Sequence, residues 1–366
     1  MNNIRKIGLT ALAGSLVTLG SAVAGEMSVS GSINTTLKFG KPDSAQGNNT
    51  SRSIGNDKDV TFSGGGELDN GTTFSVSTTL LDNYELSAST TTITTPSLGS
   101  FQIGSSTGSA SYMYDEEVPQ AYEQVSDGKQ TMANIVGNFM DNNHIMYTPP
   151  AMDFMGATFQ AHVGYTPQAS DAVVGDGGQA AYNETWGAGK ELGLTVSYEG
   201  LKAGFYGAER ENITGGQAAT GQQLSDEFNG AWYVKYSMGP VSIGYSETYL
   251  DGGVTQALSS EKTTASKAER TAGGIFTGEQ MSIAFNVNDN MSISYTTSEE
   301  TYDTQEDAKT AVTTDDDVTE SIDAIQVAYS MGGMSIKAYN MEVSNPDQDD
   351  DAADQSVTEI ALGFAF

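Results

Sequence analysis

The segment from Ser106 to Asp141 is rich in carboxylates. It holds Asp115, Glu116 and Glu117 in one run, then Glu123, and it contains a single basic residue. A ring of such side chains around a narrow polar passage favours cations, because their combined field raises the local cation concentration. The alternative is a solvated loop whose charges face water. The sequence leaves both interpretations open.

Two acidic clusters near the end of the chain could bind divalent cations. They are Asp315, Asp316 and Asp317, and Asp349, Asp350 and Asp351. Carboxylate oxygens suit Ca²⁺ and Mg²⁺, but neither cluster has EF-hand spacing. Mutually repelling, solvated loops are the simpler interpretation. We therefore predict no cofactor beyond weakly bound Ca²⁺ or Mg²⁺.

The residues typical of catalysis do not form a recognisable set. His144 and His162 are the only histidines, and both fall on the polar phase of their segments. Neither has a patterned partner for metal binding or acid–base chemistry. Ser and Asp are too abundant for composition to exclude a Ser/His/Asp set, but no Gly-x-Ser-x-Gly elbow precedes a helix. We therefore predict that the protein is not an enzyme.

Composition excludes several classes of protein. The chain has 366 residues, no cysteine and a net charge of −31, and 37% of its residues are hydrophobic. Disulfide frameworks and cysteine-based redox or metal chemistry are excluded. Nucleic-acid binding is disfavoured because phosphate contacts require a basic surface.

The first 24 residues have the three parts of a secretory signal peptide. Arg5 and Lys6 are followed by a modest apolar stretch, Ile7 to Leu19, and by the small-x-small sequence Ala22-Val23-Ala24. This order predicts export and cleavage after Ala24. The alternative is an N-terminal helix of the mature fold. Cleavage would remove two basic residues and change the net charge from −31 to −33.

Beyond the signal, apolar side chains recur at every second position. The stretch MSVSGSINTTLKFG places Met27, Val29, Ile33 and Leu37 on one face and mainly hydroxyl or amide side chains on the other. Strand side chains alternate between faces with this period. Similar stretches continue to the C-terminus, and no segment keeps a helical stripe for three turns. The pattern predicts an all-β protein.

Tight turns alternate with long polar loops. Asp69-Asn70-Gly71 marks the first tight hairpin, because the pair Asn-Gly is a strong hairpin signal. The long loops are expected near residues 40–58, 106–141, 166–189, 211–227, 250–269, 299–317 and 345–355. This spacing predicts about sixteen antiparallel strands, with a short connection at residues 81–84.

Two carboxylates break the alternation. Glu247 and Asp323 fall on the apolar phase of their strands, towards the long loops. They are expected to lie above the membrane or to follow a bulge that resets the phase. Carboxylates that face the middle of a bilayer would contradict the prediction that this sheet spans a membrane.

The alternation continues to the last residues, EIALGFAF. Ile360, Leu362, Phe364 and Phe366 are predicted to face lipid, and the small residues between them the lumen. A soluble sheet also alternates, but here the second face is almost purely hydroxyl, amide or glycine, and aromatic residues gather beside the turns. A sheet in hydrocarbon must also close on itself.

After the signal no run of 18 apolar residues exists, which excludes a helical membrane protein.

These features together resemble the Gram-negative general porins, which are sixteen-stranded and trimeric. The signal peptide, ELDNGTTF, LGSFQIGSS, NNHIMYTPP and the terminal aromatic strand carry the resemblance. It implies a transmembrane antiparallel β-barrel over residues 25–366, with short periplasmic turns and long extracellular loops. The third loop, residues 106–141, would fold into the lumen. The implied function is passive diffusion of small hydrophilic solutes and ions across the outer membrane.

The resemblance also implies a constriction. Its acidic side would be Asp115, Glu116, Glu117 and Glu123, and its basic side would lie on the opposite wall. Arginine is scarce here, and the lumen-phase basic residues are Lys38, Lys202, Lys235 and Lys337. The acidic loop and the negative net charge predict a preference for cations.

The implied partners follow from the same family. They are a homotrimer, outer-membrane lipid and lipopolysaccharide, which the acidic loops could contact through divalent cations, and the outer-membrane assembly machinery, which would recognise the strand ending in Phe366. The alternatives are an outer-membrane adhesin or surface structural protein, or a barrel enzyme without a pore. A secreted β-solenoid would need a fixed repeat of roughly 20–50 residues, and the hairpin spacing varies too much for that.

Overall fold

The computed structural model describes residues 27–41, 52–81, 86–105, 109–126, 140, 143–169, 186–212, 225–253, 275–303, 317–348 and 352–366. These residues are mostly β-strand, with two short 3₁₀ helices, η2 (Ala110–Met113) and η3 (Pro346–Gln348). No helix in the described ranges is long and apolar enough to cross a membrane. The predicted signal peptide, residues 1–24, lies outside them and stays a prediction.

The strands are β1 (Met27–Lys41), β2 (Arg52–Glu67), β3 (Thr73–Leu80), β4 (Leu86–Thr95), β5 (Gly99–Ser105), β6 (His144–Thr148), β7 (Met152–Phe154), β8 (Ala157–Thr166), β9 (Trp186–Tyr198), β10 (Leu201–Asn212), β11 (Glu227–Met238), β12 (Val241–Asp251), β13 (Ile275–Asn288), β14 (Met291–Asp303), β15 (Val318–Met331), β16 (Met334–Ser344) and β17 (Gln355–Ala365). All of their pairings are antiparallel, and they form a single sheet.

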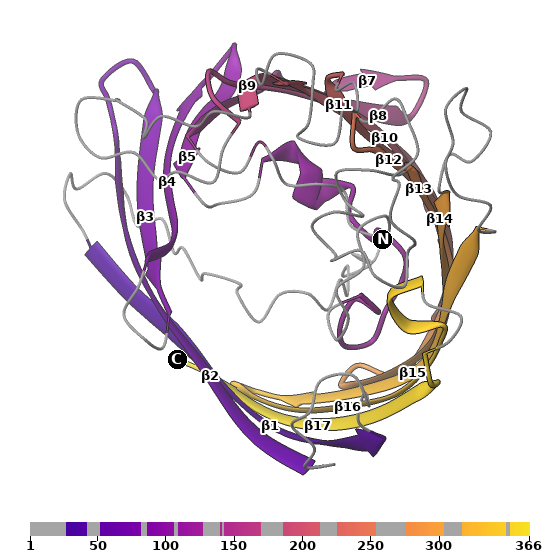
Figure 1. Cartoon of the computed structure of the whole chain (residues 1–366). Coiled ribbons are helices and arrows are strands. Elements are labelled where there is room, and N and C mark those ends of the chain that lie inside the picture. The colour runs from indigo at the N-terminus through magenta and orange to yellow at the C-terminus, as the bar shows by residue number, and fades with distance from the viewer. Residues whose placement is uncertain are drawn as a thin grey trace.

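The sheet closes into a barrel (Figure 1). Strand β1 pairs with both β2 and β17, so the ring has no free edge. Strands β6 and β7 share one place in the ring, since both pair with β8. Pro149 and Pro150 separate them, and proline has no N–H for the ladder. The seventeen strand segments therefore make a sixteen-stranded barrel, as predicted.

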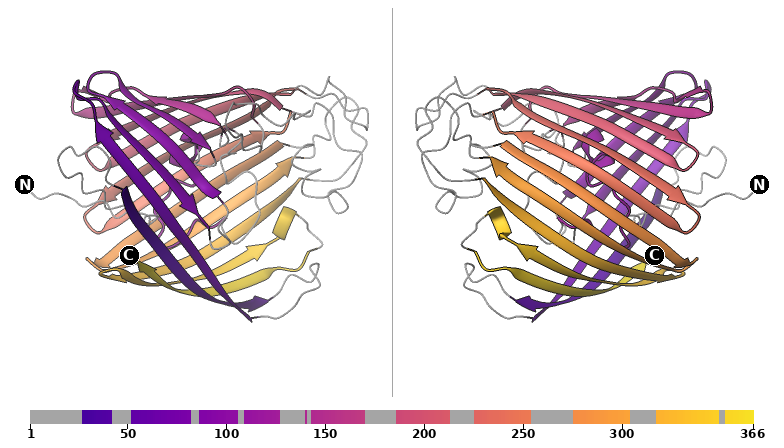
Figure 2. Two further views of the ribbon diagram at one scale, coloured as in Figure 1. Left: turned by 90° about the vertical axis from the view of Figure 1, so that its left-hand side faces the viewer. Right: turned by 90° about the vertical axis from the view of Figure 1, so that its right-hand side faces the viewer.

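The tight turns have the expected chemistry. At the first hairpin Gly71 adopts a φ of +76°, a conformation that glycine takes without a steric penalty. The Leu68 N–H donates to the Thr72 carbonyl at 2.8 Å and fastens the turn. The strands run obliquely around the barrel (Figure 2), as the right-handed twist of a closed sheet requires.

Outward and inward positions alternate as predicted. On β13, Met281 and Ile283 are 58% and 49% exposed, whereas Gln280 and Ser282 between them are 2% and 3% exposed. The apolar face therefore points away from the barrel and the polar face points inward. This arrangement suits a wall with lipid outside and a polar interior.

The C-terminal strand closes the barrel. Strand β17 pairs with β1 from Ser32↔Ala365 to Lys41↔Ser356. Phe366 continues the ladder, because its N–H donates to the Gly31 carbonyl at 3.0 Å and its carbonyl accepts from the Gly31 N–H at 2.9 Å. Its ring lies against Gly31, where an added Cβ would be 2.8 Å from a ring carbon.

Several loops are shorter than predicted. Strand β9 begins at Trp186, inside the loop expected at 166–189, and β14 runs to Asp303, inside the loop expected at 299–317. The largest difference is near the N-terminus. Residues 40–58 were expected to form a loop, but β1 extends to Lys41 and β2 begins at Arg52. The polar stretch Arg52–Asp59 pairs with β1 from Phe39 back to Ser32. Hydrogen bonding to a neighbouring strand overrides its weak strand propensity. This correction places Asp57 and Asp59 in the barrel wall.

Candidate functional site in the barrel interior

Residues 109–126 lie inside the barrel, against the inner faces of strands in the second half of the chain (Figure 1). This segment, which we call the docked loop, belongs to the third loop predicted to enter the lumen. Its contacts divide into three parts: a first anchor on β9, a middle section near β10–β13, and a last anchor on β14–β17.

The first anchor is a buried carboxylate. Glu191 on β9 is 3% exposed. It accepts hydrogen bonds from the Ser109 hydroxyl at 2.7 Å, the Ala110 N–H at 3.0 Å and the Tyr206 hydroxyl at 2.9 Å. Three donors satisfy a charge that burial would otherwise penalise. Glu191 therefore fixes the start of η2 to the wall.

An aromatic socket follows the first anchor. Tyr114 is 1% exposed and stacks on Tyr206 with ring centroids 5.3 Å apart. A Cβ added to Gly193 would overlap the Tyr114 ring, so glycine is what leaves room for it. Burial, with the negative charges of Glu191 and Glu117, raises the pKa of the Tyr114 phenol well above its usual value.

The middle of the docked loop uses its carboxylates for internal contacts. Glu116 is 4% exposed. It accepts hydrogen bonds from the Ser126 hydroxyl and, at 2.6 Å, from the Gln280 amide of β13. Glu117 pairs with Lys235, and its Oε2 lies 3.6 Å from the Lys202 Nζ. Both carboxylates are thus engaged with protein groups.

The last anchor joins the docked loop to β14, β15 and β17. The Ala121 N–H donates to Ser294 at 2.9 Å, and the Tyr122 N–H donates to Gln326 at 2.8 Å. The Tyr122 hydroxyl donates to the buried Glu359 carboxylate at 2.8 Å. Burial and neighbouring carboxylates, Glu123 first, raise the pKa of the Tyr122 phenol far above its usual value.

The four predicted constriction carboxylates therefore differ in their surroundings. Glu116 is buried behind the docked loop, and Glu117 is ion-paired to β10 and β11. Asp115 is half-buried and accepts a hydrogen bond from Gln124 at 3.5 Å. The Glu123 side chain is half-buried, and its backbone carbonyl accepts from the Gln326 amide. The structure brings them together in one loop, but two of the four face the wall.

The predicted lumen-phase lysines lie on the inner wall. Lys202 and Lys235 are directly opposite each other on β10 and β11, where both contact Glu117. The Lys38 Nζ lies 3.1 Å from the Glu359 carboxylate, and the Lys337 Nζ lies 4.9 Å from the centre of the Tyr122 ring. These lysines touch the docked loop or its anchors. Their part in ion preference stays a prediction.

The wall formed by β1–β4 has a different character. No described residue of these strands is buried, whereas inward positions of β9–β17 are largely buried beneath the docked loop and other interior residues. Its inward hydroxyls form pairs across the strands, such as Thr61 with Thr79 at 2.8 Å and Ser77 with Thr90 at 2.9 Å. This wall, which we call the hydroxyl wall, therefore faces the open part of the interior.

The other predicted sites are only partly described. Asp315 and Asp316, and Asp349, Asp350 and Asp351, lie outside the described residues, and Asp317 alone is inside them. In the described part of the chain no group of three or more His, Asp or Glu side chains could hold a metal ion. Divalent-cation binding by these clusters stays a prediction.

Both histidines lie on the inner face and are buried. His144 is 0% exposed and His162 is 6% exposed. They sit at opposite ends of β6 in the register with β8, which separates them by roughly 13 Å along the strand. Their positions do not form a two-histidine site.

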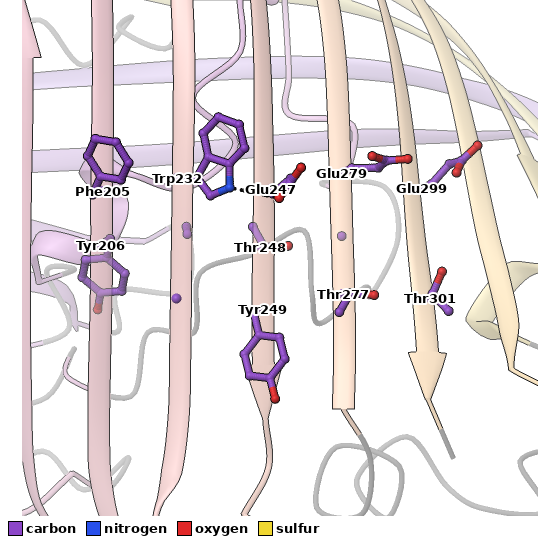
Figure 3. Close-up of a pocket in the computed structure, with 13 residues that line it drawn as sticks. Phe205, Tyr206, Trp232, Glu247, Thr248, Tyr249, Thr277, Glu279, Glu299 and Thr301 are labelled. Atoms are coloured by element: carbon purple, nitrogen blue, oxygen red, sulfur yellow. Dashed lines mark hydrogen bonds between the residues drawn. The ribbon is translucent and has the colours of Figure 1, made fainter. Parts of the chain in front are cut away.

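A row of carboxylates crosses the outer wall. Glu247, Glu279 and Glu299 lie directly opposite one another on β12, β13 and β14. They line a groove of about 520 Å³ beside Trp232 (Figure 3). The Trp232 indole N–H donates to Glu247 at 3.0 Å. No register shift occurs on either side of β12, so a bulge does not explain why Glu247 faces outward.

Asp323 also faces outward, without a register shift in β15. It accepts a hydrogen bond from the Tyr295 hydroxyl at 2.6 Å. Glu247 lies four residues from the loop-side end of β12. These carboxylates thus sit in the loop-side half of the wall among Trp and Tyr rings, which prefer the interface between lipid and water. The sequence analysis identified Glu247 and Asp323 as breaks in the alternation, but it did not identify Glu279 and Glu299.

Several important inward residues were not predicted. Glu191 and Glu359 carry no motif that distinguishes them from other acidic residues. Gly193 and Gly244 lie on the inner face, where their missing side chains leave room for Tyr114 and for Val118 with Pro119. The only available signal was glycine on the polar phase of a strand.

Comparison with known families agrees with the geometry. The sequence matches the family model of Gram-negative porins over residues 8–275. The chain belongs to the Gram-negative porin family. A closed barrel with an apolar outside and an internal loop is consistent with that membership, and it places this porin in the outer membrane as a multi-pass barrel.

Solved porins share the fold at low sequence identity. OmpF of Salmonella typhi, in complex with daunomycin, has a TM-score of 0.64 at 10% identity, covering 93% of this chain and 97% of its own. The anion-selective porin from Comamonas acidovorans has a TM-score of 0.59 at 12% identity, with coverages of 93% and 99%. OmpT of Vibrio cholerae, in a trimer form, has a TM-score of 0.58 at 13% identity, with coverages of 94% and 100%.

These likenesses establish the fold and nothing finer. No curated protein sequence matches the chain. Because an anion-selective porin has the same fold, ion preference must be argued from the residues of this chain.

Proposed function

We propose that this porin is a water-filled channel for passive diffusion of small hydrophilic solutes, and that it prefers cations. The observation that carries the proposal is the docked loop, which lies against one side of the barrel and leaves the hydroxyl wall exposed. A sixteen-stranded barrel is wide enough for an aqueous passage. No covalent chemistry is needed, because size and electrostatic field select the solutes.

The charges of the interior support the cation preference. The basic residues Lys202, Lys235 and Lys38 are paired with carboxylates. Further carboxylates, such as the half-buried Asp115 and Glu123 of the docked loop, add negative charge to the same region. The interior therefore carries an excess of negative charge, which raises the local concentration of cations.

The reversal potential in a KCl gradient tests the preference. Purified protein in a planar bilayer should give a potential of the sign expected when K⁺ crosses more readily than Cl⁻. An anion-selective potential would refute the cation preference while leaving the channel intact.

We also propose the partners that the family suggests. A homotrimer is supported by the trimer form of the Vibrio cholerae neighbour, and chemical crosslinking would test it. The turn side would face the periplasm, and the loop side would face the exterior and lipopolysaccharide. Phe366, which completes the closing ladder, would be read by the assembly machinery. Export through cleavage after Ala24 is tested by N-terminal sequencing of the mature protein.

The alternative functions make a different prediction. An adhesin, a surface structural protein or a barrel enzyme without a pore would remain in membranes after a carbonate wash, as a porin does. It would not increase the ion conductance of a bilayer. Conductance therefore separates these functions, whereas extraction does not.

A further inference from the structure

We propose that Asp57 and Asp59 of β2 determine the ion preference of the passage. This inference rests on the proposed channel function and deepens it. It transfers the main selective charge from the docked loop to the hydroxyl wall. The ligand class is small hydrated cations, attracted by fixed carboxylates without being bound at one site.

The register places both carboxylates on the inner face. Asp57 lies opposite Asn34 of β1, and Asp59 lies opposite Ser32. Residues of β1 with the same phase include Lys38, whose partner Glu359 is fastened to the docked loop. This phase therefore points into the barrel. Asp57 is exposed and Asp59 is half-exposed, so both can reach water in the passage.

Asp59 has hydrogen-bond donors around it but no basic partner among the described residues of this wall. The Ser32 hydroxyl donates to Asp59 at 2.7 Å, and the Ser32 N–H donates to the same oxygen at 3.0 Å. In the described parts of β2–β5, the register puts no basic residue on the inner face, and Lys58 has the outward phase.

The docked loop contrasts with this wall. Glu117 is paired with two lysines, and Glu116 is buried against β13. A paired charge has little net field, and a buried one is separated from the passing ion by protein atoms. Asp57 and Asp59 stand on the hydroxyl wall, where no described residue of β1–β4 is buried. Asp57 and Asp59 therefore act directly on ions in the open side of the interior.

The size of the effect follows from screening. A fixed charge acts on ions within about 8–10 Å at physiological salt. The charge raises the local concentration of K⁺ and lowers that of Cl⁻. The K⁺ to Cl⁻ permeability ratio therefore changes by the product of these two factors. A charge about 6 Å from the ion path changes the K⁺ to Cl⁻ permeability ratio by roughly threefold.

The test compares charge removal on the two faces of the wall. Asp57→Asn and the double variant Asp57→Asn/Asp59→Asn keep the side-chain shape and the acceptor oxygen. Asp323→Asn is the matched control, because it removes the same charge from the outer face. We expect the permeability ratio to fall roughly threefold for one substitution and further for two, with no change in the control. An unchanged ratio in the folded double variant would overturn the proposal.

A second measurement does not depend on the hydrogen bonds of Asp59. The chain has no cysteine, so Asp57→Cys provides a single thiol. Its thiolate displaces sulfinate from a methanethiosulfonate reagent and forms a mixed disulfide. Modification by a cationic reagent should give a lower K⁺ to Cl⁻ permeability ratio than modification by an anionic reagent of similar size. Equal effects of the two reagents would overturn the proposal.

The two hypotheses can fail separately. If the wild-type channel prefers anions, the proposed cation preference fails, but neutralising Asp57 should still move the ratio towards anions. If the wild type prefers cations and the Asp57 variants leave its ratio unchanged, only the role of Asp57 and Asp59 fails.

Discussion

Replacing Glu191 by glutamine should release the start of the docked loop. The carboxylate accepts three hydrogen bonds, two on Oε2 and one on Oε1. Glutamine has one acceptor oxygen, so its NH₂ group must face at least one of these donors. The least damaging orientation keeps the bonds from Ser109 and Tyr206 and opposes the NH₂ group to the Ala110 N–H.

The cost can be worked from these contacts. A hydrogen bond to a charged group contributes about 1.5–3 kcal/mol, and a neutral one about 0.5–1.5 kcal/mol. The bond from Tyr206 lies within the wall and survives release of the loop. Glu191→Gln therefore loses one loop bond, from Ala110, and weakens another, from Ser109, so the docked state should lose about 3 kcal/mol relative to a released loop. This corresponds to a change of about a hundredfold in the docking equilibrium.

Limited proteolysis and single-channel recording measure the release. The variant should be cleaved faster within residues 109–126, and its open-channel current should be noisier and larger on average. Glu209→Gln is the matched control, since Glu209 is exposed on the outward phase of β10. If Glu191→Gln and Glu209→Gln give the same cleavage rate and noise, the anchoring role of Glu191 is wrong.

Three further predictions follow from the packing. Gly193→Val should displace Tyr114 from its socket and increase conductance, and unchanged conductance would contradict the role of this glycine. Gly31→Val should clash with the ring of Phe366 and with the Asp59 carbonyl of β2, and so lower the temperature at which the barrel loses its heat-sensitive gel mobility; an unaltered transition would count against close packing at this part of β1. Because burial raises the pKa of Tyr122, its hydrogen bond should be complete below the ordinary tyrosine pKa of about 10 and be lost only above the raised value. At a pH near the ordinary tyrosine pKa, Tyr122 should still be protonated. The tyrosinate absorbance of the wild type should therefore match that of Tyr122→Phe at this pH.

The barrel could be predicted because its signal is repeated in every strand. A period of two over many segments fixes the outward face, and turns such as Asn70-Gly71 set the register of hairpins. The closing strand ending in Phe366 follows the same rule. These features depend on neighbours in sequence or on a uniform environment, and both are visible in one sequence.

The interior could not be predicted to the same depth. The fate of Glu116 depends on Gln280, which is 164 residues away along the chain, and no local pattern encodes that contact. Asp57 lies in a polar stretch that has the composition of a loop and becomes a strand only because β1 pairs with it. In both cases long-range pairing decides the outcome.

The outer carboxylates show a third limit. Glu299 lies in the loop predicted at residues 299–317, but β14 continues to Asp303, and the prediction assigned no face to Glu279. Their alignment with Glu247 becomes evident only from the register of three strands. Like charges placed opposite each other are unfavourable in a sheet, so water or lipid headgroups rather than hydrocarbon should surround them.

The central claim is that a water-filled passage runs through the barrel beside the docked loop. Single-channel recording of the purified wild-type protein in a planar lipid bilayer tests it most directly. Insertion should produce discrete current steps of uniform size, proportional to voltage and to salt concentration. Protein that is inserted and retains its heat-sensitive gel mobility, yet gives no conductance, would contradict the claim.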